Sequence, residues 1–410
     1  ATNPAQRVGA VLLLPGGPGY SSLDTLRGDL SHTVSAEVRA RFDVIGFDPR
    51  GIGASAPLNC SPVVSDNDPV PSDQASLDQL AATRSRRWAA CAVQSKGLAM
   101  HMDSISQARD VEAIRVALGE PQINLIGWSY GTLTARTYSA MYGNRIRTRL
   151  LTGLFEHSHD LAAKSAEEGA KMGKFYEYFA AWAAIQPTSA LRGQDAHTRL
   201  LNLIRKADTK PLPAGGNNPV TGDDIRGMIQ QAGYANQSPK VWPPLTTALA
   251  QAIQGDGSGL RKILSQGGDS GFDFTASRAT YCNDNAIISS SYAEVIAAIA
   301  RSDAQLGPWA SPKPDVADMI SCQGWPPPLA YPPQQIQDGG PPALLVNSRY
   351  DVATAYSGAL RVAAELPGSR LLTADGAGHI VLSGPCQPFM TRYLIDRTLP
   401  PPGRHCPVAA

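Results

Sequence analysis

Short, continuous runs of apolar residues recur in the first and last parts of the chain, and most end in turns rich in glycine or acidic residues. Continuous rather than alternating hydrophobicity is typical of strands that are buried on both faces, as in a parallel sheet. The pattern therefore predicts buried strands at residues 8–14, 42–47, 122–128, 149–155, 343–346 and 369–373.

Segments with helical periodicity lie between these runs. From residue 106 to residue 118 the apolar side chains fall mostly on one face, and Gly119, with Pro121 beyond it, is a typical helix stop. Strands that alternate with helices indicate an α/β fold, with a mostly parallel sheet and helices on both faces.

The stretch from residue 156 to residue 337 breaks this alternation. It is rich in Ala, Gln, Tyr and Trp, has helical periodicity and offers few strand-like runs. We therefore expect residues 1–155 to form the first half of an α/β core, residues 156–337 a helical lid inserted into it, and residues 338–410 the second half.

The composition is consistent with this organisation and limits the kinds of partner that are expected. The chain has 410 residues, of which 43% are hydrophobic, which is enough for a large core with an insertion. Its formal charge is +1, from 36 basic and 35 acidic residues without long runs of either sign, so nucleic acid is not an expected partner. No apolar stretch approaches the roughly 18–20 residues that span a bilayer, so no membrane segment is expected.

The cysteines indicate the kind of cellular compartment in which the protein is found. Three disulfides fit the even set of cysteines better than zinc does, because none has the close spacing of a metal site, although six reduced thiols would give the same count. Disulfides would imply export, since they persist in oxidising compartments. A chain that starts at Ala1 would then have lost a signal peptide or have been shortened. The six are Cys60, Cys91, Cys282, Cys322, Cys386 and Cys406.

The G-x-S-x-G pattern of a nucleophile elbow occurs at residues 127–131, with Ser129 at its centre. It follows a predicted strand and precedes a helical run near Thr132, which is the strand-turn-helix context that the motif needs. The glycines permit the crowded turn, and the helix N-terminus supplies backbone N–H groups for an oxyanion. A serine in an ordinary turn would also fit the bare motif, but the context favours Ser129 as a nucleophile.

A glycine-rich segment, PGGPG at residues 15–19, directly follows the first predicted strand. Because glycine has no side chain, its backbone can approach a substrate carbonyl closely. The N–H of Gly17 can pair with that of Tyr130 to bind a developing negative charge. A glycine- and proline-rich turn alone would not indicate any function. The position of this segment, after the first predicted strand and upstream of the elbow, is the one that a hydrolase requires.

A candidate base and acid lie near the C-terminus. His379 stands in a glycine-rich turn directly after a predicted strand, where a general base can reach the nucleophile. Asp351 closes the strand-like run that begins at residue 343, and the order Ser, Asp, His is the one that α/β-hydrolases use. Asp375 is a rival acid close to His379, but Asp351 is favoured because it lies at its own strand end.

Residues 157–160, His-Ser-His-Asp, resemble part of a metal site. Two histidines with one residue between them are more typical of a solvated loop when no distant third ligand is evident. We expect no metal and no other cofactor.

Together these segments resemble the secreted tripeptidyl aminopeptidase-like serine hydrolases, relatives of the proline iminopeptidases with the α/β-hydrolase fold. The resemblance covers most of both sheet-forming parts, and the order and spacing of its segments make it specific. The segments are LLLPGGPGYSS at 12–22, FDPRGIGAS at 47–55, ARDVEAIRVALGEPQINLIGWSYGT at 108–132, PPALLVNSRYDVATAY at 341–356, DGAGHIVLSGPC at 375–386 and YLIDRTLPPPGRHC at 393–406.

The resemblance implies that Ser129 is the nucleophile, Asp351 the acid and His379 the base of a peptide hydrolase. It further implies three disulfides, which are Cys60–Cys91, Cys282–Cys322 and Cys386–Cys406.

Two features depart from that family. The family commonly has an acid in the strand end after the elbow helix, in a form like LDG, where this chain reads Leu-Thr-Gly at residues 151–153. Its members also usually carry hairpin strands before the PGGPG strand, which here begins almost at once. Either this chain lacks those strands or a separate piece supplies them.

The expected substrate is a short peptide or a small acyl compound. An aminopeptidase needs a carboxylate for the α-ammonium group of its substrate, since that charge is costly to bury unpaired. An esterase or amidase acting on small acyl or lactone substrates is the alternative, because the same residues serve both reactions. A binding protein without activity is a third class, which the intact Ser, Asp and His argue against. The candidate carboxylates are Glu156, Asp160, Glu177 and Asp284.

Overall fold

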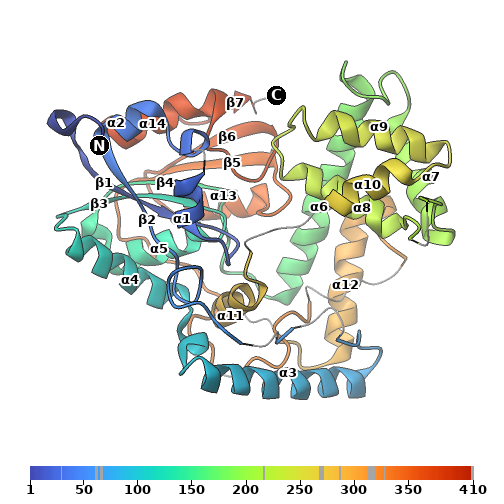
Figure 1. Cartoon of the computed structure of the whole chain (residues 1–410), viewed down its shortest axis with the longest axis horizontal. Helices are drawn as coiled ribbons and strands as arrows, with labels where there is room; N and C mark the ends of the chain where they lie inside the picture. The colour runs from blue at the N-terminus through green and yellow to red at the C-terminus, as the bar shows by residue number, and fades with distance from the viewer. Residues whose placement is uncertain are drawn as a thin grey trace.

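The computed structural model of the chain describes residues 1–407 except 29, 61–62, 65–67, 216–217, 267–271, 286–287, 313–318 and 327. Within these residues, one seven-stranded sheet has the order β2-β1-β3-β4-β5-β6-β7 (Figure 1). Every pair of neighbours is parallel, which confirms the predicted α/β class. The strands are β1 (Gly9–Leu14), β2 (Phe42–Gly46), β3 (Ile123–Trp128), β4 (Ile146–Thr152), β5 (Leu344–Tyr350), β6 (Arg370–Ala377) and β7 (His405–Pro407).

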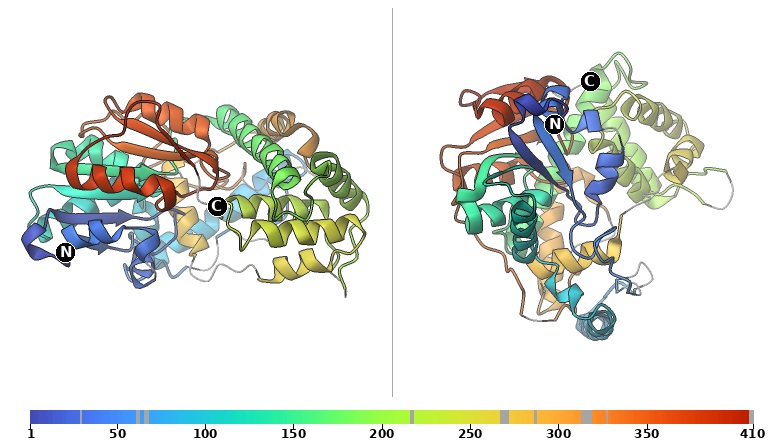
Figure 2. Two further views of the ribbon diagram at one scale, coloured as in Figure 1. Left: turned by 90° about the horizontal axis from the view of Figure 1, so that it is seen from above. Right: turned by 60° about the vertical axis from the view of Figure 1, so that its left-hand side comes forward.

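Helices cover both faces of the sheet (Figure 2). On one face α4, α5 and α13 bury side chains such as Val111 and Val362 against the strands. On the other face α2 and α14 bury Val38 and Met390. Burial on both faces explains why the strands read as continuous apolar runs. The core helices are α1 (Ser22–Arg27), α2 (Ala36–Arg41), α4 (Ser104–Ala117), α5 (Gly131–Tyr142), α13 (Tyr356–Glu365) and α14 (Gln387–Asp396).

The bounds of β4 differ from the prediction, because the strand runs from Ile146 to Thr152 rather than from 149 to 155. Two arginines interrupt its apolar pattern but are satisfied inside the fold. Arg149 is fully buried and donates to Asp338 at 2.6 Å. Arg147 donates to the last carbonyls of α14. The short strand β7 was not predicted, since three residues carry no readable pattern.

The stretch between β4 and β5 is helical, as its periodicity predicts. Its longest helix, α6, packs along α12, and Gly169 permits the contact because a Cβ there would lie 2.1 Å from the carbonyl oxygen of Ser302. The helices are α6 (Leu161–Ile185), α7 (Ala196–Thr209), α8 (Gly222–Gly233), α9 (Trp242–Ile253), α10 (Ser258–Gln266), α11 (Phe274–Asn285) and α12 (Tyr292–Leu306).

Helix α3 (Gln74–Gln94) comes from the first part of the chain but joins this helical region (Figure 1). It packs against α12, and Trp88 meets Trp325 edge to face with ring centroids 4.5 Å apart. The helical region therefore includes α3 as well as helices from residues 156–337. Its lower part combines α3 with α11, α12 and the segment that leads back to β5.

Three disulfides brace these contacts, and their pairing is the one that the resemblance implies. The first ties the loop after β2 to α3, the second ties α11 to the segment before β5, and the third ties the start of α14 to β7. Closing loops of 20 to 40 residues stabilises a fold by roughly 3–4 kcal/mol each in the chain-entropy account. In the described residues no helix is long and apolar enough to cross a membrane. The pairs are Cys60–Cys91, Cys282–Cys322 and Cys386–Cys406.

Candidate active site

Ser129 lies in the turn between β3 and α5 with a φ of +54°, a region that residues other than glycine rarely adopt. Its N–H donates to the carbonyl oxygen of Thr152 at 2.9 Å. Glycines make room for this turn: a Cβ at Gly131 would lie 2.1 Å from the carbonyl oxygen of Leu14, and one at Gly16 would lie 2.4 Å from the Cβ of Ser129. The strained turn thus holds the serine directly against the PGGPG loop.

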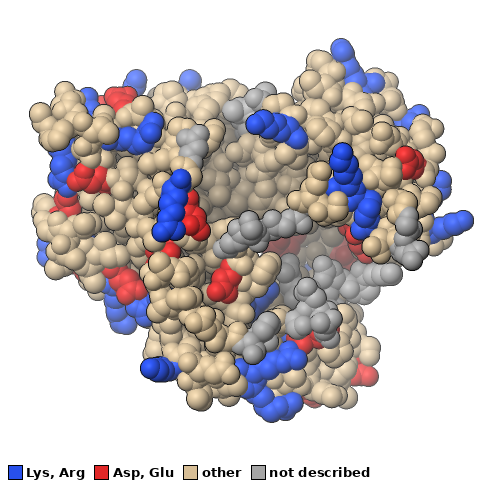
Figure 3. All heavy atoms as spheres, in the orientation of Figure 1, with Lys and Arg blue, Asp and Glu red and all other residues tan. Residues whose placement is uncertain are grey.

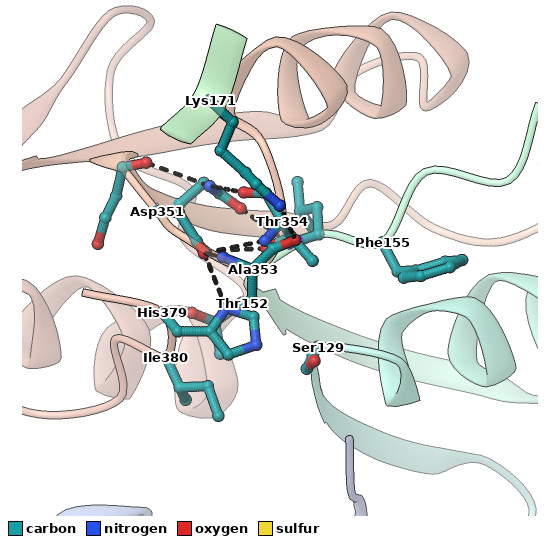
Figure 4. Close-up of polar contacts among 12 residues, drawn as sticks. Ser129, Thr152, Phe155, Lys171, Asp351, Ala353, Thr354, His379 and Ile380 are labelled. Carbon is teal, nitrogen blue, oxygen red and sulfur yellow. Dashed lines mark hydrogen bonds and ion pairs between the residues drawn. The ribbon is translucent and has the colours of Figure 1, made fainter. Parts of the chain in front are cut away.

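His379 and Asp351 form a buried pair beside this serine. The Nδ1 atom of His379 lies 3.0 Å from each carboxylate oxygen of Asp351, and the two residues are 6% and 1% exposed. Figure 4 shows the other ring nitrogen facing the hydroxyl of Ser129. In this arrangement the imidazole can accept the proton of the serine, while the carboxylate stabilises the imidazolium that forms.

The loop after β5 holds Asp351 in place. Its Oδ1 accepts from the N–H groups of Ala353 and Thr354 at 2.8 and 2.9 Å, and its Oδ2 accepts from the Thr354 hydroxyl at 2.9 Å (Figure 4). The rival acid Asp375 lies elsewhere. Its carboxylate is 47% exposed and contacts His405 and Arg349 at the surface.

Thr152 stands where the resembled family commonly has an acid, and it links both halves of the site. Its carbonyl accepts from Ser129, while its hydroxyl accepts from the N–H of Val381 in the histidine loop at 3.1 Å. The next residue, Gly153, leaves room for that loop, because a Cβ there would lie 2.9 Å from the carbonyl oxygen of His379. The neutral hydroxyl of Thr152 therefore holds the loop that carries His379.

The proposed oxyanion donors lie at the same place. Gly17 follows the strand that ends beside the elbow, and Tyr130 directly precedes α5. Within the described part of the chain, their backbone N–H groups are not used in other hydrogen bonds. Both can therefore donate to an oxyanion beside Ser129.

Asp284 of α11 anchors the elbow to the lid. It is fully buried, and its Oδ2 accepts from the hydroxyls of Tyr130 at 2.7 Å and Ser104 at 2.6 Å. Burial raises the pKa of Asp284 to about 7, although these hydrogen bonds act to lower it. Its carboxylate is thus engaged beneath the elbow rather than facing a substrate.

We expect Asp284 to make the protein less stable as the pH rises towards neutrality. Its pKa is about 7 in the fold and ordinarily 3.8, so between those values the folded state binds more protons than the unfolded state. The free energy of unfolding therefore falls as the pH rises through this window, by at most about 1.4 kcal/mol per pH unit.

The variant Asp284→Asn removes this titration. The neighbouring His157, whose pKa burial lowers to about 4, is present in both proteins, so its contribution largely cancels when the two are compared. Chemical denaturation from pH 4.5 to 8 should show the wild type losing stability relative to the variant. A stability difference that does not change with pH would contradict this role.

A cavity of about 380 Å³ opens beside the His–Asp pair, between the carboxyl edge of the sheet and the lid. Its wall includes Gly17 and residues 352–354, which directly follow Asp351. Tyr234, at the end of α8, also lines it and packs edge-on against the ring of His379 at 5.6 Å. Figure 3 shows the surface hollowed between the sheet part and the helical part.

Of the four carboxylates considered for substrate binding, the structure places only Glu156 on the cavity wall. Asp160 caps α6 by accepting from the N–H of Ala163 at 2.8 Å. Glu177, farther along α6, accepts from the indole N–H of Trp309 at 2.7 Å. Asp284 is buried beneath the elbow, as described above.

Glu156 is ionised but already has partners. Burial acts to raise its pKa, but His159 and Ser158 outweigh that effect and lower the pKa to about 2. The Nδ1 atom of His159 lies 3.0 Å from its Oε2, and the N–H of Ser158 donates to its Oε1 at 2.7 Å.

Sequence reasoning missed two further carboxylates on the wall, Glu167 and Glu168 of α6. Lys171 donates to Glu168 at 2.5 Å and also donates to the carbonyl oxygen of Ala353, beside Asp351, at 3.0 Å. Burial acts to lower the pKa of Lys171, but the interaction with Glu168 outweighs burial, and the pKa of the lysine is raised. The spacing of Lys164, Glu168 and Lys171 puts all three on one helix face, a signal that was available in the sequence.

The histidine-rich segment does not converge on one point. His157 contacts the carbonyl oxygen of Asp284 through Nε2 at 3.1 Å, whereas His159 pairs with Glu156. Asp160 points to the start of α6. Among the described residues no group of three or more His, Cys, Asp or Glu side chains could hold a metal ion.

Comparison with known sequences shows the family to which the chain belongs. The sequence model of the α/β hydrolase fold matches residues 9–383. The chain belongs to the α/β-hydrolase family. It is similar to the serine protease Hip1 of Mycobacterium tuberculosis, with 26% identity over 98% of this chain and 81% of that protein. The tripeptidyl aminopeptidase of Streptomyces coelicolor is 29% identical over 94% of this chain and 73% of that protein.

Other α/β-hydrolases are also similar. The carboxylesterase B of Mycobacterium tuberculosis is 27% identical over 98% of this chain and 80% of that protein. A solved hydrolase from Oleispira antarctica has a TM-score of 0.37 and 16% identity, and the match covers 95% of this chain and 91% of that one. The chain is thus a serine hydrolase of this fold, with relatives named as peptidases and as an esterase.

Proposed function

We propose that this α/β-hydrolase is an aminopeptidase that cleaves amide bonds near the free N-terminus of short peptides. The observation that carries the proposal is the placement of carboxylates, among them the ionised Glu156, on the wall of a cavity that is also lined by Gly17 and by residues 352–354, directly after Asp351. The volume of about 380 Å³ lies at the lower end of small-molecule pockets, which span roughly 300–1,000 Å³. It suits a short peptide better than a folded protein.

The reaction would proceed through an acyl-enzyme. Ser129 attacks the scissile carbonyl while His379 takes its proton, and the N–H groups of Gly17 and Tyr130 bind the oxyanion. His379 then returns the proton to the leaving amine, and a water molecule hydrolyses the ester in a second cycle. Asp351 keeps the imidazole in the tautomer that both steps need.

Glu168 is the carboxylate best placed to bind the α-ammonium group of a substrate. Its side chain is 36% exposed, whereas that of Glu156 is 5% exposed and held by His159 and Ser158. Its partner Lys171 also contacts the loop of Asp351, so an amine bound at Glu168 would lie near the reacting groups.

Acetylation of the substrate amine should lower kcat/KM strongly, because it removes the charge that the carboxylate binds. One charge-assisted hydrogen bond contributes roughly 1.5–3 kcal/mol, or about one to two decades in rate. Steady-state kinetics on free and N-acetylated tripeptidyl amides measure the difference, and Glu168→Gln should largely abolish it.

The matched control is Glu177→Gln, which neutralises a carboxylate of the same helix outside the cavity and should keep the preference for the free amine. Glu156→Gln tests another acid on the wall. Equal hydrolysis of free and acetylated peptides by the wild type would contradict the aminopeptidase assignment.

A second candidate function is ester hydrolysis, which the similarity to a carboxylesterase favours. The same serine, histidine and aspartate would act on small acyl esters. Rapid turnover of simple esters together with no cleavage of any peptide amide would select this function.

We also propose that the protein is exported. Three disulfides support this localisation, because such bonds persist in oxidising compartments.

A further inference from the structure

Arg278 of α11 lies on the wall of the cavity. It is half-buried, and in the described part of the chain it makes no hydrogen bond or ion pair. A guanidinium that is partly withdrawn from water without a partner is unfavourable. Because Arg278 faces a cavity, a bound molecule could supply the missing anion.

The carboxylates of the cavity are occupied by other groups. Among the described residues, each of the three acids on the wall pairs with a side chain other than Arg278. Of the acids nearest in sequence, Asp273 accepts from the N–H of Ala276 and Asp284 is held beneath the elbow. The three pairs are Glu156–His159 at 3.0 Å, Glu167–Arg361 at 2.5 Å and Glu168–Lys171 at 2.5 Å.

Further guanidiniums lie near Arg278. Asp68 is shared by two guanidiniums, those of Arg84 and Arg87, at 2.9 and 2.6 Å. Burial lowers the pKa of Arg84, and the nearby charges of Arg278 and Arg87 lower it further although Asp68 opposes them. An anion in this part of the cavity would therefore be attracted by more than one cation.

The helix that carries Arg278 contacts the PGGPG loop. Its neighbour Ser277 packs against the PGGPG loop, since a Cβ at Gly19 would lie 3.1 Å from the Cβ of Ser277. One turn farther along α11, the hydroxyl of Tyr281 accepts a hydrogen bond from Lys164. The cavity wall thus carries a cation from each of the two helices, Arg278 of α11 and Lys164 of α6, together with the carboxylate of Glu168.

We propose that Arg278 binds a carboxylate of the substrate, so that the preferred substrates are short peptides with a free carboxylate as well as a free amine. The inference rests on the proposed function, because it specifies the peptide. The planar guanidinium suits a carboxylate, to which it can donate two parallel hydrogen bonds. That carboxylate comes either from the C-terminus of the peptide or from an acidic side chain.

The test compares peptides that differ in one carboxylate. One pair has the same sequence with a C-terminal acid or a C-terminal amide, and a second pair, both amidated, differs in a Glu or Gln side chain. We expect the wild type to prefer the carboxylate-bearing member of at least one pair by about 10- to 100-fold in kcat/KM. Arg278→Gln should abolish that preference, and Arg278→Lys should retain part of it.

The matched control is Arg86→Gln, at an exposed arginine of α3, which should keep the preference. A preference in the first pair identifies the C-terminal carboxylate as the ligand, and one in the second pair identifies the acidic side chain. Equal rates within both pairs for the wild type, or a preference that survives Arg278→Gln, would overturn the proposal. Melting temperatures check that each variant folds, and Arg278→Lys still tests the charge if Arg278→Gln does not.

A binding measurement separates this proposal from the proposed function. The same peptides are used as inhibitors of the hydrolysis of a neutral ester, phenyl acetate, so that affinity is measured whether or not the peptide is cleaved. If the carboxylate-bearing peptide of a pair inhibits the wild type more strongly than its neutral counterpart does, and this difference is lost in Arg278→Gln, the subsite is supported even if no peptide is hydrolysed. If both peptides of each pair inhibit the wild type equally, the subsite is overturned even if peptides are good substrates.

Discussion

Replacing Ser129 with alanine is expected to lower kcat by roughly 10⁴- to 10⁶-fold while substrate affinity changes little. The hydroxyl forms the covalent bond in the proposed mechanism, so no other group can take its place. The fold should survive, because alanine is smaller than serine and the turn is held by backbone hydrogen bonds and glycine contacts.

Kinetics on purified Ser129→Ala and a binding assay with an uncleaved peptide measure the two effects. Ser265→Ala, at an exposed serine of α10 outside the cavity, is the matched control and should retain full activity. Retention of more than a few per cent of activity in a clean preparation of Ser129→Ala would remove Ser129 from the role of nucleophile.

The second large effect is expected for Asp351→Asn, at roughly 10⁴-fold in kcat. An asparagine amide would favour the wrong tautomer of His379 and could not stabilise the imidazolium. It would also disturb the three hydrogen bonds that Asp351 accepts from Ala353 and Thr354.

Asp375→Asn is the matched comparison, because it makes the same change at the rival acid. Its carboxylate is exposed and pairs with His405 and Arg349, and exposed pairs contribute only about 0–1 kcal/mol. We therefore expect little change in activity. A pH–rate profile of each variant shows whether the working pKa of the base has moved. A larger loss for Asp375→Asn than for Asp351→Asn would reassign the acid.

The sheet could be predicted from the sequence because its strands are buried on both faces. Val11, Leu12 and Leu13 are each 0% exposed. Because neither face of such a strand is polar, the apolar run in the sequence is not interrupted. The prediction was less accurate at β4, where Arg147 and Arg149 are satisfied by partners far away in sequence. Those partners cannot be read from local periodicity.

The residues proposed for chemistry lie at strand ends, and this is why the sequence could place them. Ser129, Asp351 and His379 follow β3, β5 and β6, and a parallel sheet brings these ends to one edge. Local sequence pattern cannot place side chains of the lid in this way. Asp284 and Glu168 are both lid carboxylates, but only the packing of α6 and α11 buries the first and leaves the second on the cavity wall.

The proposed mechanism requires a covalent bond between Ser129 and the acyl group of the substrate. Treating the native protein with a fluorophosphonate and mapping the adduct by peptide mass spectrometry tests for it, with Ser129→Ala as the control. We predict one phosphonyl group per chain, located on the peptide that contains Ser129, and none on the variant. An adduct on another serine, or equal labelling of the wild type and the variant, would contradict the account.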